Sequence, residues 1–509
     1  MMSFDLSIPG QLSLALLPEL VLAAGAMLLL LIAAWGKESD ARARTVGVLA
    51  IVLSLITSAI IIWMWLSGAK ATPGIIAVDS FRWASDLVIL IATIITIALG
   101  LDYARVEQLV SAETYVLVLL ASAGMMLLTS ARDLIMVFLG IELMSIAVYI
   151  LAGVNRRSAK AAEASLKYFL LGAFSTGFLL YGIALIYGAT GSTDLATIGA
   201  KVTGATIGSQ PMLLAGIALL LVGFAFKVAA VPFHMWTPDV YEGAPTPITA
   251  YMAAAVKAAA FAALFRVWRE AFPGALGSWH LALWWLAVLT MVVGNLVALV
   301  QKNIKRMLAY SSIAHAGYLL VAVVANNQLG SAAFLFYVLA YTLATMGAFG
   351  VVIAVGEPGE RHQQLSDFAG LWTVRPWLAA AMAVFMLALL GFPIAGGMGF
   401  FAKWYVLQAA LDATHPETGL AVVVVLASVL SAGYYLAVVM VMFMRPRSAD
   451  APALRPVRTP TFLVVYASAI ILLFFGIFPG GFTGLARNSV PTITASAPSA
   501  SPPTAVAGR

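Results

Sequence analysis

Two lysines lie inside apolar stretches that are long enough to cross a lipid bilayer. The segment 223–257 reads GFAFKVAAVPFHMWTPDVYEGAPTPITAYMAAAVK and contains both of them, Lys227 and Lys257. A lysine at the centre of a membrane helix costs roughly 2.5 to 3.5 kcal/mol on insertion scales, so such residues normally face a polar interior and mark an ion path. Pro232 removes a backbone donor between the two lysines and predicts that the first helix breaks beside its lysine. A broken helix next to a buried charge is typical of transporters.

The composition indicates a polytopic membrane protein. Of the 509 residues, 62% are hydrophobic and only 10% are charged, whereas soluble domains carry about 25% charged residues. The absence of cysteine excludes disulfides, thiolate-bound metals and iron–sulfur clusters. The chain also lacks glycine-rich nucleotide loops and metal-ligand spacings, so we expect it to hold no cofactor and no metal and to hydrolyse no ATP by itself. The N-terminal residues show no basic region with a cleavage site, and we predict no removable targeting segment.

The hydrophobic pattern predicts an all-α membrane fold. A template of about 20 apolar residues per helix finds fourteen segments: 14–35, 45–66, 78–101, 112–130, 133–153, 162–190, 211–232, 246–270, 279–300, 306–325, 330–355, 376–411, 419–444 and 460–480. The twelfth is too long for one crossing and contains GFPIAGGMGF, so we predict a second break at Pro393. We therefore predict one transmembrane domain over 1–485 and a disordered Pro/Ser/Ala-rich tail over 486–509.

The basic residues predict the orientation. Of the 28 Lys and Arg residues, 16 fall after odd-numbered spans. Eight fall on the opposite side, namely Lys70, Arg82, Arg132, Lys201, Arg266, Arg269, Arg487 and Arg509. Because basic residues collect in cytoplasmic loops, both termini are predicted to be periplasmic, and the net charge of +6 reflects membrane orientation rather than nucleic-acid binding.

The order of the spans suggests an internal repeat. Helices 4 to 8, over 111–270, and helices 9 to 13, over 279–445, form two groups of five with a broken helix fourth in each. Because five is odd, two such groups in series have opposite orientations in the membrane. This is the inverted-repeat plan of many transporters.

Several ionisable residues fall within the predicted helices. Glu142, Lys227 and Lys257 lie near the middle of spans 5, 7 and 8, and Lys403 follows the break in span 12. A nearby carboxylate raises the pKa of a buried lysine and burial lowers it, so a small change in the neighbour can move a proton. We therefore predict a proton path through Glu142, Lys227, Lys257, Lys403, His315 and Lys167.

Plainer roles exist for these residues. Buried charges can simply hold helices together, His315 has Ser311 and Ser312 beside it as hydrogen-bonding partners, and Lys167 is close enough to a helix start to reach the interface. Asp239 and Glu242 are expected to serve as cap or turn residues in a loop. Convergence of four ionisable residues on two broken helices favours the proton path.

Three motifs reveal a resemblance to a known family. They are AEASLKYFLLGAFSTGFLLYGIALIYG at 162–188, FKVAAVPFHMWTPDVYEGAPTPITAYMAAAVKAAA at 226–260 and NIKRMLAYSSIAHAGYLL at 303–320. Across nearly its whole length the chain resembles the subunit N family of proton-pumping NADH:quinone oxidoreductase (respiratory complex I), which is one of three antiporter-like membrane subunits. Its short C-terminal extension and the lysine at 403 favour subunit N over its sisters.

The resemblance implies functions for the residues above. It implies a Glu142–Lys227 pair between helices 5 and 7, Lys257 as a connecting lysine, Lys403 as the helix 12 lysine, and His315 on a central polar axis. It also implies partners: the neighbouring antiporter-like and small membrane subunits, and indirectly the peripheral redox arm with NADH, FMN, iron–sulfur clusters and quinone. The expected location is the bacterial inner membrane. The photosynthetic counterpart, a cation/proton antiporter subunit and a non-transporting scaffold remain alternatives.

Overall fold

The computed structural model describes residues 2–35, 39–109, 111–202, 210–394, 396–448 and 454–489. Its first half contains β1 (Ser3–Phe4), α1 (Pro9–Ala15), α2 (Leu17–Ala34), α3 (Asp40–Leu66), β2 (Lys70–Ala71), α4 (Ser80–Val106), α5 (Glu113–Ser130), α6 (Leu134–Ala152), α7 (Ala159–Thr190), α8 (Leu195–Lys201), α10 (Pro211–Lys227), α11 (Thr237–Gly243) and α12 (Thr246–Tyr251). A π-helical turn (Met252–Val256) then leads into α13 (Lys257–Ala271).

The second half is also helical. A 3₁₀ turn (Pro273–Ala275) precedes α14 (Leu276–Leu299), α15 (Ile304–Val324) and α16 (Gln328–Val355). Another (Leu365–Phe368) precedes α17 (Leu371–Val374), α18 (Pro376–Leu390), α19 (Met398–Leu411), α20 (Thr418–Met444), α21 (Thr459–Ile477) and α22 (Gly480–Asn488). The expected all-α membrane class is confirmed.

Within the described ranges, twelve helices are long and apolar enough to cross a membrane, and α10 and α18 are shorter apolar helices. The helix count of fourteen and the inverted repeats stay predictions. Two features were not foreseen: the N-terminal strand pairs in parallel with β2, and α22 continues to Asn488, so 486–488 are helical rather than part of a tail. The rest of the predicted tail, from 490, lies outside the described residues.

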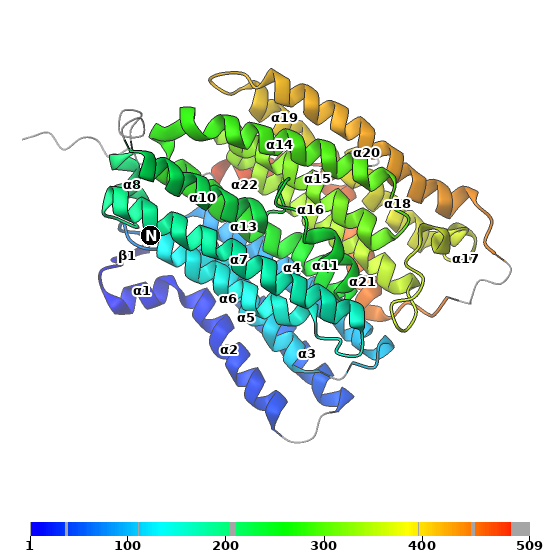
Figure 1. Ribbon diagram of the computed structural model, residues 1–509. Coiled ribbons are helices and arrows are strands. Elements are labelled where there is room, and N and C mark those ends of the chain that lie inside the picture. The colour runs from blue at the N-terminus through cyan, green and yellow to red at the C-terminus, as the bar shows by residue number, and fades with distance from the viewer. Residues whose placement is uncertain are drawn as a thin grey trace, which may run out of the picture.

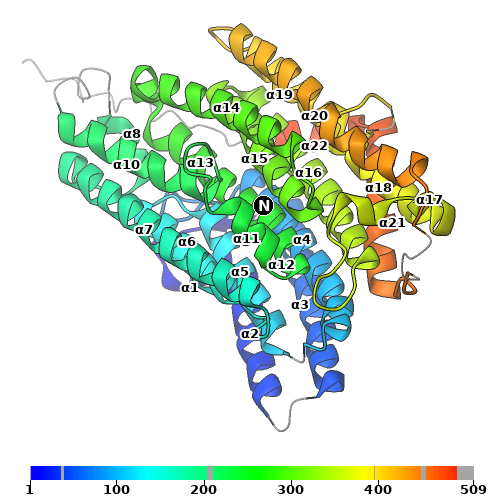
Figure 2. The same ribbon diagram turned by 45° about the vertical axis from the view of Figure 1, so that its right-hand side comes forward.

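Three long helical segments form the centre of the protein. In the most apolar 18-residue stretch of each, all residues of the segment Thr246–Ala271 are buried, as are 94% of those of α15 and 89% of those of α16. By contrast, α2, α3, α20 and α21 are only 33% buried. Figures 1 and 2 show α2 and α3 at one edge of the molecule and α19 and α20 at the opposite edge. The outer helices therefore present apolar side chains to lipid, while the centre is shielded from it.

Several basic residues that the sequence analysis assigned to loops are in fact buried, and three of them form ion pairs. Arg82 is 0% exposed and pairs with Glu19 at 2.6 Å, and Arg266 is 2% exposed and pairs with Asp79 at 2.8 Å. Lys305, at 0%, pairs with Glu360 at 2.7 Å. Counting them as loop charges was wrong, because acidic partners distant in sequence stabilise them inside the protein.

Glu360 joins several helices at the end of the molecule where α15 begins. Its carboxylate accepts hydrogen bonds from Tyr103 of α4 (2.8 Å), from the backbone and side chain of Thr246 at the start of α12 (2.8 and 2.7 Å), and from Lys305 of α15 (2.7 Å). Burial alone would raise the pKa of Glu360, but Lys305 and the other donors hold it below its ordinary value. The carboxylate is therefore ionised and fixes the central helices relative to one another.

We expect Glu360→Gln to lower the free energy of unfolding by about 3 kcal/mol at pH 7, because it leaves Lys305 buried without its counter-charge. Thermal unfolding of the detergent-solubilised chain measures this, with Glu163→Gln as the control because the Glu163 side chain is 62% exposed. A carboxylate with a depressed pKa stabilises the fold above its unfolded value of about 4.3 and loses that contribution as pH falls through the folded value. The difference between parent and variant should therefore persist from pH 7 to 5 and shrink in more acidic solution; equal stabilities at pH 7 would contradict this role.

The predicted orientation can be tested at the two ends of α3. Ala41 and Lys70 are both exposed and lie near opposite ends of this 27-residue helix. Because the chain has no cysteine, a single cysteine at either position is a unique label. A membrane-impermeant maleimide should label Lys70→Cys from the periplasmic side and Ala41→Cys only after the membrane is opened. Labelling of both positions from one side would contradict the predicted topology.

Candidate functional site

The first candidate lysine lies where a membrane helix stops. Helix α10 ends at Lys227, and α11 begins only at Thr237. Between them, Pro232 lies in a non-helical segment whose Val231 N–H donates to Thr290 Oγ1 of α14 at 2.9 Å. The last carbonyls of a helix have no partner within the helix, and the dipole there favours a cation. The break therefore creates a polar position for Lys227 inside the membrane domain.

Lys227 is bound by hydroxyl groups. Its side chain is buried, and Nζ donates to Ser145 Oγ at 2.8 Å and to Tyr149 OH at 3.2 Å, both on α6. The Tyr149 ring packs edge-on against Tyr168 of α7, with ring centroids 4.7 Å apart. Two neutral oxygens thus take the place of water around this ammonium group.

The structure does not form the expected ion pair between Glu142 and Lys227. Within the described part of the chain, no carboxylate oxygen lies within 4.0 Å of Lys227 Nζ, and Glu142 Oε1 is buried without a hydrogen-bond partner. Glu142, Ser145 and Tyr149 follow one another at helical spacing along one face of α6. Lys227 contacts Ser145 and Tyr149. Glu142 precedes Ser145 by about one helical turn, so its carboxylate lies about one turn from the nearer of the lysine's present partners.

Lys257 lies at an irregular turn within a continuous helical segment. It follows the π-helical turn Met252–Val256, and such turns occur frequently at functional sites. Its buried Nζ donates to the backbone carbonyl and the hydroxyl of Ser312 on α15. The Tyr341 ring of α16 lies 5.9 Å from the same nitrogen. No carboxylate pairs with Lys257 among the described residues.

His315 lies one turn after Ser312 on α15. It is 3% exposed, and both ring nitrogens have partners: Nδ1 is 2.6 Å from Tyr337 OH on α16, and Nε2 is 3.0 Å from Tyr435 OH on α20. The Tyr435 hydroxyl also hydrogen-bonds with Ser311. A neutral imidazole donates at one nitrogen and accepts at the other, so a proton can enter at one side of the ring while another leaves from the opposite side.

Lys403 lies at the second break. Helix α18 ends at Leu390 and α19 begins at Met398, with Pro393 in the non-helical segment between them. Lys403 Nζ donates to the Leu390 carbonyl at 2.9 Å and lies 4.5 Å from the Tyr318 ring centroid of α15. Gly391 has a φ of +76°, and a Cβ there would meet Lys403 Cδ at 2.8 Å. Glycine at 391 therefore both ends the helix and makes room for the lysine.

Helix α15 connects Lys257 with Lys403. Ser312, His315 and Tyr318 follow at intervals of three residues, and they contact Lys257, the tyrosine hydroxyls and Lys403 in turn. The His315 ring centroid lies 4.9 Å from Tyr341 and 5.6 Å from Tyr318. We call this set, Lys257, Ser312, His315, Tyr318, Tyr337, Tyr341, Tyr435 and Lys403, the α15 polar chain.

Lys167 lies outside this chain. Its side chain is 41% exposed and pairs with Glu163 at 2.6 Å and Asp239 at 2.8 Å, while Asp239 also pairs with Arg306 at 2.8 Å. Burial would raise the pKa of Asp239, but its hydrogen bonds from Lys167 and Arg306 hold it below its ordinary value. Asp239 is thus an ion-pair partner that joins α7, α11 and α15, rather than the cap or turn residue that the sequence analysis expected.

Sequence reasoning missed most of the hydroxyl groups at the site. It singled out no tyrosine, although Tyr149, Tyr337 and Tyr435 contact the candidate ionisable residues. The spacing of Ser312, His315 and Tyr318 was a usable signal. The buried Glu19–Arg82–Asp86 group joins α2 and α4, and the pairing across these helices carried no local signal because Glu19 is far in sequence from Arg82 and Asp86.

Metal binding receives no support from the side-chain arrangement. Among the residues that the structure describes, no group of three His, Asp or Glu side chains is close enough to hold a metal ion. The ionisable groups of the site are lysines, one histidine and a carboxylate, all of which exchange single protons.

Comparisons with known proteins identify the family. The model of the family described as "NADH:quinone oxidoreductase/Mrp antiporter, TM" matches residues 131–431. The chain is 54% identical over 507 residues to NADH-quinone oxidoreductase subunit N of Gemmatimonas aurantiaca, covering 97% of this chain and 96% of that protein. It is 44% identical over 482 residues to the subunit N of Trichlorobacter lovleyi, covering 94% and 97%.

Solved structures have the same fold. A chain of respiratory complex I from Thermus thermophilus, determined with bound aureothin, matches with a TM-score of 0.78 and 38% identity over 92% of this chain and 99% of that chain. A chain of the Mrp complex from Dietzia sp. matches with a TM-score of 0.78 at 21% identity over 94% and 97%, which shows the fold alone. The chain belongs to the subunit N family of NADH:quinone oxidoreductase.

Proposed function

We propose that this membrane subunit carries protons through Lys227, Lys257, His315 and Lys403, and that Glu142 modulates Lys227. One observation carries the proposal. In the described part of the chain, Lys227, Lys257 and Lys403 are bound by hydroxyls, carbonyls or aromatic rings and by no carboxylate within 4.0 Å, unlike the buried Lys305, which pairs with Glu360. A charged lysine held this way is only weakly stabilised, so loss of its proton costs less than it would in an ion pair.

Glu142 offers the counter-charge that Lys227 lacks in this conformation. Glu142 lies on the same face of α6 as Ser145 and Tyr149, which Lys227 contacts. Its Oε1 is buried and has no hydrogen-bond partner in the described part of the chain. Lys227 is the last residue of α10, and four methylene groups carry its nitrogen, so the side chain has several rotamers available for a move toward Glu142. Approach favours the charged lysine, and withdrawal to Ser145 and Tyr149 favours proton release.

The α15 polar chain offers the connection between the remaining groups. Lys257 contacts Ser312, and Ser311 and Tyr435 link that part of α15 to His315. Tyr318 lies between His315 and Lys403 through ring contacts. Ring contacts do not carry protons, so transfer between His315 and Lys403 requires water or a rotation of a side chain. Lys167, in its half-exposed ion pairs, is proposed only as an entry group on the surface.

The redox steps belong to other subunits in this proposal. This chain holds no flavin, iron–sulfur cluster or metal, and NADH, FMN and quinone act elsewhere in the complex. Its partners are the neighbouring membrane subunits, and its location is the bacterial inner membrane with both termini periplasmic. The same chain acts as a translocase only in the assembled complex. The likeness to the Mrp complex extends to the fold alone.

Replacement of Lys227 by arginine separates proton transfer from fixed charge. Arginine stays protonated at any accessible pH, so Lys227→Arg should assemble but pump protons roughly tenfold more slowly or worse. The measurement is proton translocation per electron transferred in vesicles containing the whole complex. Lys160→Arg is the matched control, because the Lys160 side chain is 73% exposed. Parental pumping by an assembled Lys227→Arg complex would make Lys227 a fixed electrostatic element.

Loss of the hydroxyls around His315 should slow proton movement without removing the histidine. Tyr337→Phe and Tyr435→Phe each delete one partner of the ring, at about 1 kcal/mol per hydrogen bond, which is roughly a fivefold effect on rate. Tyr466→Phe on α21 is the control, because that ring is partly exposed and packs against Phe462. The readout is again protons per electron, since a purely structural defect would lower assembly and leave this ratio unchanged.

A further inference from the structure

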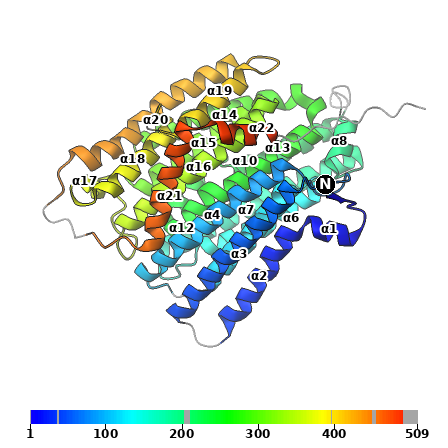
Figure 3. The ribbon, with the colours of Figure 1, turned by 180° about the vertical axis from the view of Figure 1, so that it is seen from behind.

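A large groove lies between α3, α4 and α21, outside the proposed proton path. Its volume is about 930 Å³, within the range of about 300 to 1,000 Å³ that is usual for ligand pockets. Most of its lining is aliphatic, including Ile51, Ile94 and Leu463, and Leu343 of α16 contributes as well. Figure 3, the view from behind, shows α3, α4 and α21 on the same side of the molecule.

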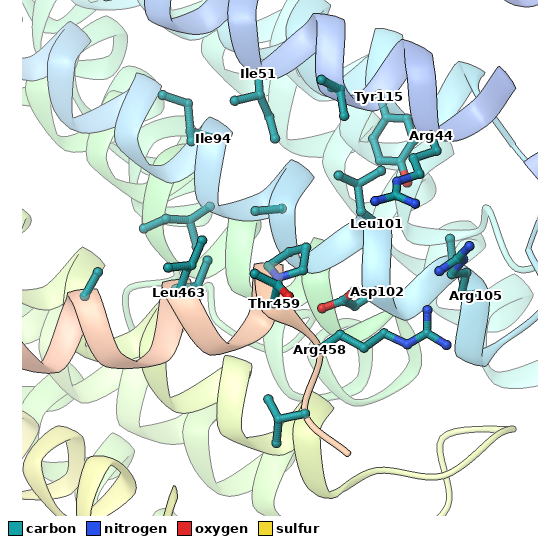
Figure 4. Close-up of a pocket in the computed structure, with 18 of the residues that line it drawn as sticks. Arg44, Ile51, Ile94, Leu101, Asp102, Arg105, Tyr115, Arg458, Thr459 and Leu463 are labelled. Atoms are coloured by element: carbon teal, nitrogen blue, oxygen red, sulfur yellow. The ribbon is translucent and has the colours of Figure 1, made fainter. Parts of the chain in front are cut away.

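Basic side chains gather at one end of this groove. Arg44 is in the first turns of α3, Arg105 in the last turn of α4, and Arg458 just before α21. Figure 4 shows the three arginines at the same end, with Ile94 and Leu463 farther along. All three are exposed, and no hydrogen bond or ion pair involves their side chains within the described ranges.

Two carboxylates also line the groove, but one of them is already used. Asp102 Oδ2 accepts hydrogen bonds from the backbone and the hydroxyl of Thr461 at 3.0 and 2.7 Å, which fixes the start of α21 against the end of α4. Asp40 is exposed at the start of α3. Three arginines against two aspartates leave the lining positive, and the N-terminus of the 19-residue helix α21 adds to that potential.

The length of the groove matches one leaflet of a bilayer. Its lining runs from Arg105 back to Ile91 on α4 and from Arg458 to Ile471 on α21, which is about 20 Å along each helix at 1.5 Å per residue. Half of a hydrocarbon core of about 30 Å, together with one headgroup layer, has about this thickness. A transmembrane helix of another subunit would need a groove along the full thickness. The dimensions therefore favour a lipid over a partner helix.

We propose that the groove binds an anionic phospholipid, whose phosphate lies between Arg44, Arg105 and Arg458 and whose acyl chain lies along α4 and α21. Guanidinium groups bind phosphate oxygens in pairs of hydrogen bonds, and basic pockets between membrane helices on the cytoplasmic side bind acidic headgroups. The positive-inside assignment puts all three arginines on that side. A ligand that fits this groove needs both a negatively charged headgroup, for the arginines, and a long aliphatic chain, for the apolar lining.

The test uses the whole complex purified in mild detergent and depleted of lipid. Dioleoyl phosphatidylglycerol is added back in steps, with dioleoyl phosphatidylcholine as the neutral comparison, and bound lipid is counted by native mass spectrometry. The complex with Arg44→Gln, Arg105→Gln and Arg458→Gln together should bind phosphatidylglycerol roughly tenfold or more weakly at one site. The control carries Arg156→Gln, Arg157→Gln and Arg361→Gln, three exposed cytoplasmic-side arginines that do not line the groove.

A second pair of variants tests the aliphatic part of the groove and does not change charge. Ala467→Phe places a ring in the groove and should also remove one bound lipid, whereas Ile470→Phe, three residues later and outside the lining, should not. A photoreactive residue at Ile94 should cross-link to added lipid. Three results would overturn the proposal: retention of phosphatidylglycerol by both groove variants, equal binding of phosphatidylcholine at this site, or a cross-link from Ile94 to another subunit.

Discussion

The cost of an unpaired charge inside the protein governs the architecture around the site. A lysine in an apolar interior without partners would lose its proton permanently or destabilise the fold. Lys227, Lys257 and Lys403 each lie beside an irregularity in a helix: Lys227 ends α10, Lys257 follows a π-helical turn, and Lys403 follows the break between α18 and α19. Their oxygen partners come from Ser145 and Tyr149 of α6, from Ser312 of α15 and from the carbonyl that ends α18. In the described part of the chain, hydroxyl and carbonyl oxygens rather than carboxylates therefore bind the amino groups of these three lysines.

The membrane class, most helix positions and the site's lysines could be predicted from the sequence because they depend on local patterns. A bilayer admits only segments that satisfy their own backbone hydrogen bonds, so an apolar run of sufficient length defines a helix. Pro232 and the glycines near Pro393 interrupt two such runs, and both helices end before them, at Lys227 and Leu390. The length of an apolar run, a proline within it and a charged residue within it can all be recognised from residues that are close together in the sequence.

The partners of these residues could not be predicted, because they come from distant helices. The sequence put Glu142 beside Lys227 through family resemblance, yet Lys227 contacts Ser145 and Tyr149 on the same helix face. It also counted Arg82 and Arg266 as loop charges, whereas Glu19 and Asp79 stabilise them in the interior. Hydropathy assigns a cost to each charged residue separately. The packed structure decides whether another helix supplies the compensating group.

The helices at the centre link regions with different roles. The first turn of α15 carries Lys305, which pairs with Glu360, and the helix continues to Ser312 and His315 in the α15 polar chain. Helix α16 carries Tyr337 and Tyr341 into the same chain and presents Leu343 to the groove beside α21. Successive residues of one helix face different directions, so α16 contacts the α15 polar chain with one face and the groove with another. A rotation of α16 that moved Leu343 would also move both tyrosines, because a regular helix turns as a unit.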